Sequence, residues 1–177
     1  MFYKVVISLL LAISSVLIAQ ENKKAKYDVF SFDKEVTLPG TPETIFDAVT
    51  GDISGWWDHS FSDSPKKFFI EARPGGGFWE IFDEKGNGVL HATVIYSDRG
   101  KILRFNGPLG LSGKAIQVVT TYTFNPVSSD STMFKVSVHA AGEVDEGVPE
   151  IVESVWNHFI FEQLEPYIKS GKHLLKE

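Results

Sequence analysis

The histidines, which could hold a metal or do acid–base chemistry near neutral pH, are few and widely spaced in this 177-residue chain. Its five histidines stand singly, at His59, His91, His139, His158 and His173, and no two have the short spacing of a metal-binding motif. The chain has no cysteine, so it offers neither a thiolate ligand nor a thiol nucleophile. The sequence therefore predicts no metal site and no cofactor.

Two polar residues, Gln163 and Glu80, could reach the interior, and His59 is the histidine of most interest. His59 directly follows Trp56-Trp57-Asp58, a segment expected near the mouth of a cavity, although an exposed loop histidine is the ordinary interpretation of such a residue. Gln163 falls near the centre of the apolar arc of the last helix, between Phe159 and Tyr167. Its amide is either satisfied by nearby backbone or available to bind the polar end of a ligand.

The sequence leaves open the direction in which Glu80 points. In one strand register Glu80 shares a face with Phe78 and Phe82 and points inward, where its carboxyl could act as an acid or base. In the other register Trp79 and Ile81 point inward and Glu80 faces water. No nucleophile elbow, phosphate loop or dinucleotide fingerprint completes a catalytic set, so no catalytic residue is assigned.

The composition favours a hydrophobic partner over a charged one. The net charge is −6, which argues against nucleic acid and anionic membranes as partners, because both require clustered Lys and Arg. Aromatic residues make up 13% of the chain, and they either fill the core or line a void for an apolar ligand. The predicted cavity residues are Trp56, Trp57, Phe61, Phe78, Glu80, Phe82, Phe105, Tyr122, Val138, Val152, Trp156, Phe159 and Gln163.

Residues 1–19 have the layout of a secretory signal peptide. Lys4 supplies a positive start, Val5 to Ile18 is almost entirely apolar, and Ala19 is a small residue before a polar stretch. The apolar run is shorter than the roughly 20 residues of a membrane-spanning helix, although a retained anchor is the alternative. We expect a secreted or periplasmic protein without a stable membrane anchor, with a lead-in at 20–26, one domain at 27–171 and a tail at 172–177.

Two amphipathic helices are expected to bracket a run of strands. The first helix runs from Thr41 to Thr50, with a short second turn from Asp52, and the last runs from Pro149 to about Ser170 with a kink at Pro166. The apolar character of the loop 106–113 predicts that it lies over another part of the protein. The predicted strands are Tyr27–Leu38, Phe68–Glu71, Phe78–Phe82, Gly88–Tyr96, Ile102–Asn106, Ala115–Phe124 and Met133–Ala140.

This order of elements resembles the START-like superfamily, in the branch named after the activator of Hsp90 ATPase, which includes polyketide-cyclase-like proteins. The residues that carry the likeness are Pro42 to Thr50, Trp56-Trp57, Arg73 to Phe78, and Trp156 with Leu164 and Lys169 to Gly171. The resemblance implies an α+β helix-grip fold, in which a curved antiparallel sheet wraps around a long C-terminal helix, with two short helices after the first strand. It also implies a hydrophobic cavity between sheet and helix.

Three functions remain open at this stage. The favoured one is an exported domain that binds a small hydrophobic ligand in this cavity. The second is an enzyme of the polyketide cyclase or aromatase kind that uses Glu80, His59 or Gln163, which requires at least two of these groups to converge in one pocket. The third is an envelope protein-interaction domain whose cavity is vestigial. Neither the identity of the ligand nor the oligomeric state can be predicted.

Overall fold

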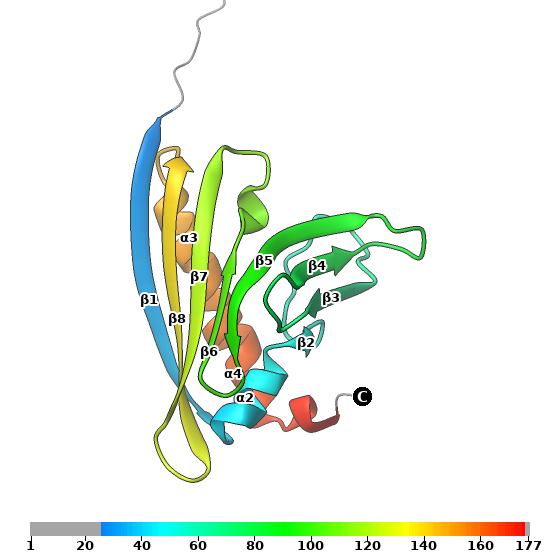
Figure 1. Cartoon of the computed structure of the whole chain (residues 1–177), viewed down its shortest axis with the longest axis vertical. Coiled ribbons are helices and arrows are strands. Elements are labelled where there is room, and N and C mark those ends of the chain that lie inside the picture. The colour runs from blue at the N-terminus through cyan, green and yellow to red at the C-terminus, as the bar shows by residue number, and fades with distance from the viewer. Residues whose placement is uncertain (1–25, 176–177) are drawn as a thin grey trace, which may run out of the picture.

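The computed structural model describes residues 26–175, which contain one eight-stranded antiparallel sheet (Figure 1). The order of strands across the sheet is β1-β8-β7-β6-β5-β4-β3-β2, so from β2 to β8 each strand pairs with its successor and β1 pairs with β8. The predicted signal peptide lies outside the described residues. The strands are β1 (Tyr27–Pro39), β2 (Gly51–Asp52), β3 (Lys67–Ile70), β4 (Gly77–Ile81), β5 (Gly88–Asp98), β6 (Ile102–Asn106), β7 (Ile116–Pro126) and β8 (Ser131–Glu143).

The first helix, α2 (Pro42–Ala48), forms where the sequence predicts it. The hydroxyl of Thr41 accepts a hydrogen bond from the Thr44 N–H at 3.3 Å, and Pro42 occupies the first helical position. Ile45 and Phe46 are buried on the face that packs against β7 and β8. The N-cap and the apolar spacing therefore specify this helix locally.

The short helical turn predicted after Asp52 is present, but the second short helix implied by the resemblance is wrong, because this single turn does not continue. The N–H groups of Trp56 and Trp57 both bond to the Ile53 carbonyl, at 3.1 and 3.0 Å, and no helix follows. Asp52 belongs instead to β2, and the Ile53 N–H bonds to the Phe68 carbonyl of β3 at 3.0 Å. The residues that would have begun a helix thus make their backbone hydrogen bonds to the sheet instead.

The terminal helix is continuous but irregular. It consists of α3 (Val148–Asn157), the π-helical segment η2 (His158–Leu164) and α4 (Glu165–Lys169), followed by the 3₁₀ turn η3 (Lys172–Leu175). The turns before Pro166, where the sequence predicts a kink, are widened into the π-helical segment. Pro166 has no N–H to give, and in a regular α-helix its ring would collide with the carbonyl of Glu162, so a wider turn relieves that clash.

The terminal helix packs on the inner face of the sheet, behind β1, β8 and β7 in Figure 1. Along β8 the side chains of Phe134, Val136, Val138 and Ala140 are buried in alternation, as predicted, while His139 is exposed. These strand residues form one core with the buried face of the helix. The helix-grip fold expected from the sequence is confirmed.

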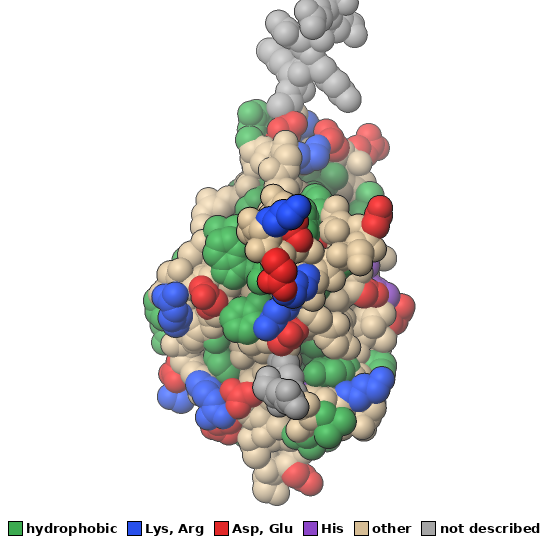
Figure 2. Space-filling model, turned by 90° about the vertical axis from the view of Figure 1, so that its right-hand side faces the viewer, with side chains coloured by type: hydrophobic (Ala, Val, Ile, Leu, Met, Phe, Trp, Pro, Cys, Tyr) green, Lys and Arg blue, Asp and Glu red, His purple; other side chains and the backbone are tan. Residues whose placement is uncertain are grey.

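The surface at the β3–β4 end of the sheet carries charges of both signs (Figure 2). Figure 2 shows basic and acidic side chains lying side by side on the face at the β3–β4 end, rather than gathered by sign. Lys67 of β3 pairs with Asp52 at 3.4 Å, and Arg73 pairs with Glu71 at 3.6 Å. Within residues 26–175, no helix combines the length and apolar character needed to cross a bilayer.

Candidate functional site

A cavity of about 350 Å³ lies between the terminal helix and the inner face of the sheet. Its walls come from the loop after β2, from β5 and β7, from the 3₁₀ turn η1 (Leu109–Leu111) and from the terminal helix. Among the described lining residues, only His59, Ser60 and His91 bring a polar side chain other than an indole. The lining residues are Trp57, His59, Ser60, Phe61, His91, Pro108, Leu109, Gly110, Leu111, Val118, Ile151, Val152, Val155, Trp156 and Phe159.

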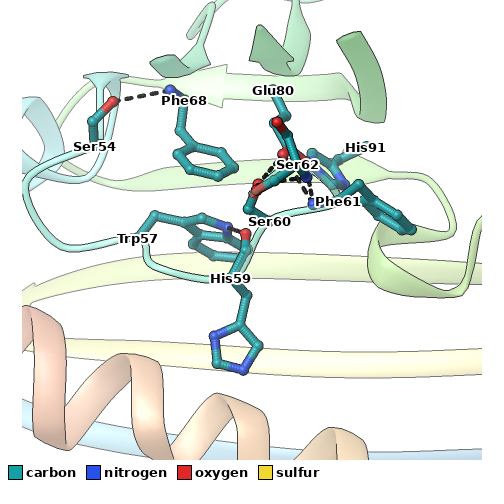
Figure 3. Close-up of polar contacts among 9 residues, drawn as sticks. All are labelled: Ser54, Trp57, His59, Ser60, Phe61, Ser62, Phe68, Glu80 and His91. Atoms are coloured by element: carbon teal, nitrogen blue, oxygen red, sulfur yellow. Dashed lines mark hydrogen bonds and ion pairs between the residues drawn. The ribbon is translucent and has the colours of Figure 1, made fainter. Parts of the chain in front are cut away.

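The loop after β2, which forms one wall of the cavity, is hydrogen-bonded to a buried carboxylate. Glu80 of β4 is fully buried and accepts hydrogen bonds from the Phe61 N–H at 2.9 Å and from the Ser60 hydroxyl. Its second oxygen lies 3.0 Å from Nε2 of His91, which is 4% exposed. Figure 3 shows these three residues converging on the carboxylate. A buried polar group is tolerated only when hydrogen bonds within the protein replace those to water, and this set of partners does so.

His91 points into the molecule because β5 contains a β-bulge. Phe78 of β4 pairs with Ala92 and Trp79 pairs with Leu90, so His91 has no partner residue on β4. The extra residue turns two consecutive side chains, His91 and Ala92, toward the interior. The bulge thus places an imidazole at the cavity wall directly in front of the Glu80 carboxylate.

Aromatic side chains of the loop after β2 also pack against the terminal helix. The Trp57 ring lies parallel to that of Phe159, with 3.8 Å between ring centroids and 20° between planes, and it meets Trp156 edge to face. The Trp57 indole N–H donates to the His59 carbonyl at 3.0 Å. His59 then rests edge-on against Phe159, 4.7 Å between centroids. These contacts hold the loop against the helix and close one side of the cavity.

A cluster of polar side chains joins the loop after β2 to the terminal helix beside the cavity. Asp58 lies 2.9 Å from Nδ1 of His59 and 2.8 Å from Nε2 of His158, while Nδ1 of His158 lies 3.0 Å from Glu162. Partial burial works to raise the pKa of the Asp58 carboxyl, but hydrogen bonds from His59 and His158 hold it below its usual value. Hydrogen bonds to Asp58 and then Glu162 raise the pKa of His158.

The turn η1 forms the third wall and contains an unusual backbone. Leu109 has φ of 51°, in the left-handed region that branched and bulky residues rarely adopt. Its side chain and that of Leu111 line the cavity. Strain of this kind is commonly found where a backbone is held for binding. The apolar loop that the sequence predicted to cover something does cover this cavity.

Five of the predicted ligand-contacting side chains line the cavity, and they are Trp57, Phe61, Val152, Trp156 and Phe159. The others lie elsewhere. Glu80 points inward, as in one of the two registers, and contacts the cavity wall from behind, while Trp79 is 38% exposed. Phe82 is half-buried just after β4, and Gln163 lies beside His158, its Nε2 3.3 Å from Nε2 of that ring. Five further residues are buried in the core beside the cavity, namely Trp56, Phe78, Phe105, Tyr122 and Val138.

Sequence reasoning missed several lining residues and one contact beside the cavity, for physical reasons. His91 had no signal, because only the bulge turns it inward. Val118 sits on the strand whose alternation was recognised, so its inward direction was available from the pattern. His158 was correctly placed on the polar face beside Glu162, but its contact with Asp58 joins residues 100 positions apart.

The sequence matches no family model and no curated protein. Solved structures are nevertheless similar along most of the chain. A protein of unknown function from Staphylococcus aureus has a TM-score of 0.61 at 12% identity, covering 83% of this chain and 98% of its own. A protein from Mesorhizobium loti has a TM-score of 0.57 at 19% identity, and the match covers 80% of this chain and 98% of its own.

A third similar structure is that of norcoclaurine synthase from Thalictrum flavum, a point mutant in complex with a transition-state analogue. Its TM-score is 0.51 at 14% identity, and it covers 84% of this chain and 99% of its own. Likenesses at such low identity establish the architecture, and the chain therefore has the helix-grip fold that the START-like resemblance implied.

Proposed function

We propose that this protein binds a small, mainly hydrophobic molecule in the cavity between the sheet and the terminal helix. The observation that carries the proposal is the cavity itself, about 350 Å³ with almost entirely apolar walls. Ligand pockets in proteins span roughly 300–1,000 Å³ and combine apolar walls with a few placed polar groups. This cavity has that character, at the small end of the range.

The arrangement of polar side chains indicates a ligand with one polar end. Ser60 and His91 both bond to Glu80, so they lie together on one side of the cavity. The walls contributed by η1 and by the terminal helix consist of apolar residues such as Leu111 and Val155. A molecule with a greasy body and a single hydrogen-bonding group matches this distribution, because every buried polar atom then finds a partner.

Binding can be tested with a dye that fluoresces in apolar surroundings, such as an anilinonaphthalene sulfonate. We expect one dye per folded chain, displaced competitively by small apolar molecules. Because such dyes also bind partly unfolded proteins, the same samples must show a cooperative thermal transition. A folded protein that takes up no dye and no apolar competitor would contradict the proposal.

We also propose that the protein acts outside the cytosol, after removal of residues 1–19. The proposal is supported by the apolar run from Val5 to Ile18 with Lys4 before it and Ala19 after it. The intact mass of the protein recovered from its natural host is expected to correspond to a chain that begins at Gln20. A mass that includes Met1, in a membrane fraction, would support the retained anchor instead.

An enzyme that uses the same cavity is the second candidate, but not with the residues predicted for it, because of Glu80, His59 and Gln163 only His59 lines the cavity. The feature that favours it is His91, an imidazole at the cavity wall with a carboxylate behind it, which is an arrangement suited to a general base. Incubating the protein with the molecule recovered from it distinguishes the two, since a carrier returns that molecule unchanged. The interaction domain with a vestigial cavity is not favoured, because it needs a filled interior.

A further inference from the structure

Three potential metal ligands meet at the edge of the cavity. One nitrogen each of His59 and His158 and one carboxylate oxygen of Asp58 all lie within 4.8 Å of one another. Asp58 and His59 come from the loop that closes the cavity, and His158 begins the π-helical segment of the terminal helix. Two imidazoles and a carboxylate are a ligand set that divalent transition metals commonly take in proteins.

Each imidazole is already oriented by a contact outside the cluster. Nδ1 of His158 lies 3.0 Å from the Glu162 carboxylate, so Nε2 is the nitrogen turned toward Asp58. This carboxylate–histidine pair is the arrangement that orients imidazole ligands in metal sites. His59 is held against Phe159, and its backbone carbonyl accepts from the Trp57 indole. Both imidazoles are therefore turned toward Asp58 by contacts within the protein.

We propose that Asp58, His59 and His158 form a binding site for a divalent transition metal of the zinc class. Bonds of about 2.0–2.2 Å at tetrahedral angles would separate the ligand atoms by about 3.4 Å. Oδ1 of Asp58 now lies 2.9 Å from Nδ1 of His59 and Oδ2 lies 2.8 Å from Nε2 of His158. One ligand atom from each of the three residues lies within 4.8 Å of the other two. Small side-chain rotations are enough to admit an ion, which replaces the protons in these two hydrogen bonds. The negative charges of Asp58 and Glu162 favour a cation here.

The site has three protein ligands, so it leaves at least one coordination position for water or another oxygen donor. His59 belongs both to the metal cluster and to the cavity wall. The ion would therefore lie beside any ligand that the cavity holds. This last consequence rests on the proposed ligand binding, whereas metal binding itself does not and is measured without any organic ligand.

The probe is Zn²⁺, titrated by calorimetry into chelator-treated protein from which any polyhistidine tag has been removed. We expect one equivalent bound per chain. His158→Asn and Asp58→Asn should each weaken binding at least about 100-fold, and Glu162→Gln, which loses only the outer contact, by about 10- to 100-fold. Substituting Co²⁺ should give the visible absorption of a tetrahedral site in the unaltered protein and lose it in His158→Asn.

The matched control is His139→Asn, which removes an exposed histidine on β8, away from the cluster. This variant should bind Zn²⁺ as the unaltered protein does. His158 is 28% exposed at its side chain, so the asparagine variant should stay folded, which circular dichroism checks. The proposal is overturned if the unaltered folded protein binds no Zn²⁺, or if His158→Asn binds it equally well.

Discussion

Replacing Glu80 with alanine is expected to lower the free energy of unfolding by about 3–5 kcal/mol, because three groups lose the acceptor they share and each unsatisfied buried group costs about 1–3 kcal/mol. The Ser60 hydroxyl, the Phe61 N–H and Nε2 of His91 all lose their common partner inside the protein. Chemical denaturation measures this loss. Because the loop of Ser60 and Phe61 lines the cavity, dye binding should weaken in the same variant.

Glu84→Ala is the matched control for the Glu80 prediction. The Glu84 side chain is 83% exposed and pairs with Lys66 on the surface. An exposed ion pair contributes only about 0–1 kcal/mol, so this variant should unfold almost like the unaltered protein. Equal losses of stability in the two variants would show that the burial of Glu80 does not have the energetic role assigned to it.

Val155→Trp is expected to weaken dye binding at least about tenfold, or about 1.4 kcal/mol, while leaving the fold intact. Val155 lies on α3, is half-buried and lines the cavity. An indole at this position projects into the empty volume and needs no rearrangement of the surrounding core. Fluorescence titration measures the affinity, and the thermal midpoint shows whether the variant is folded.

Ser154→Trp places the same side chain one residue earlier, on the exposed side of the helix and away from the cavity. It should bind dye with unchanged affinity. If the two tryptophan variants bind dye equally well, the dye occupies some other surface and the cavity is not the site. If both lose binding, the helix rather than the cavity volume is responsible.

The fold could be predicted because its determinants are local. Thr41 and Pro42 specify the start of α2, and the alternation of apolar residues from Phe134 to Ala140 specifies which face of β8 is buried. Turn residues separate the strands at the spacing of a meander. The absence of a second short helix after Asp52 could not be predicted in this way, because it depends on the pairing of Ile53 with β3.

The site was less predictable because its geometry depends on irregularities and on distant contacts. A single extra residue in β5 directs His91 inward, against the two-residue period of a strand. The π-helical segment changes the periodicity of the terminal helix, so Gln163, placed in the apolar arc by a 3.6-residue period, lies beside His158 instead. The meeting of Asp58 with His158 depends on how the loop folds over the helix.

Native mass spectrometry of the protein purified from its natural host tests the central claim most directly. We predict a population that carries one small molecule per chain, which dissociates on gentle activation and is recovered in organic solvent as a mainly apolar compound. The Val155→Trp variant from the same source should carry less of it than Ser154→Trp. A protein that is always free of ligand, with identical spectra for both variants, would contradict the proposed binding function.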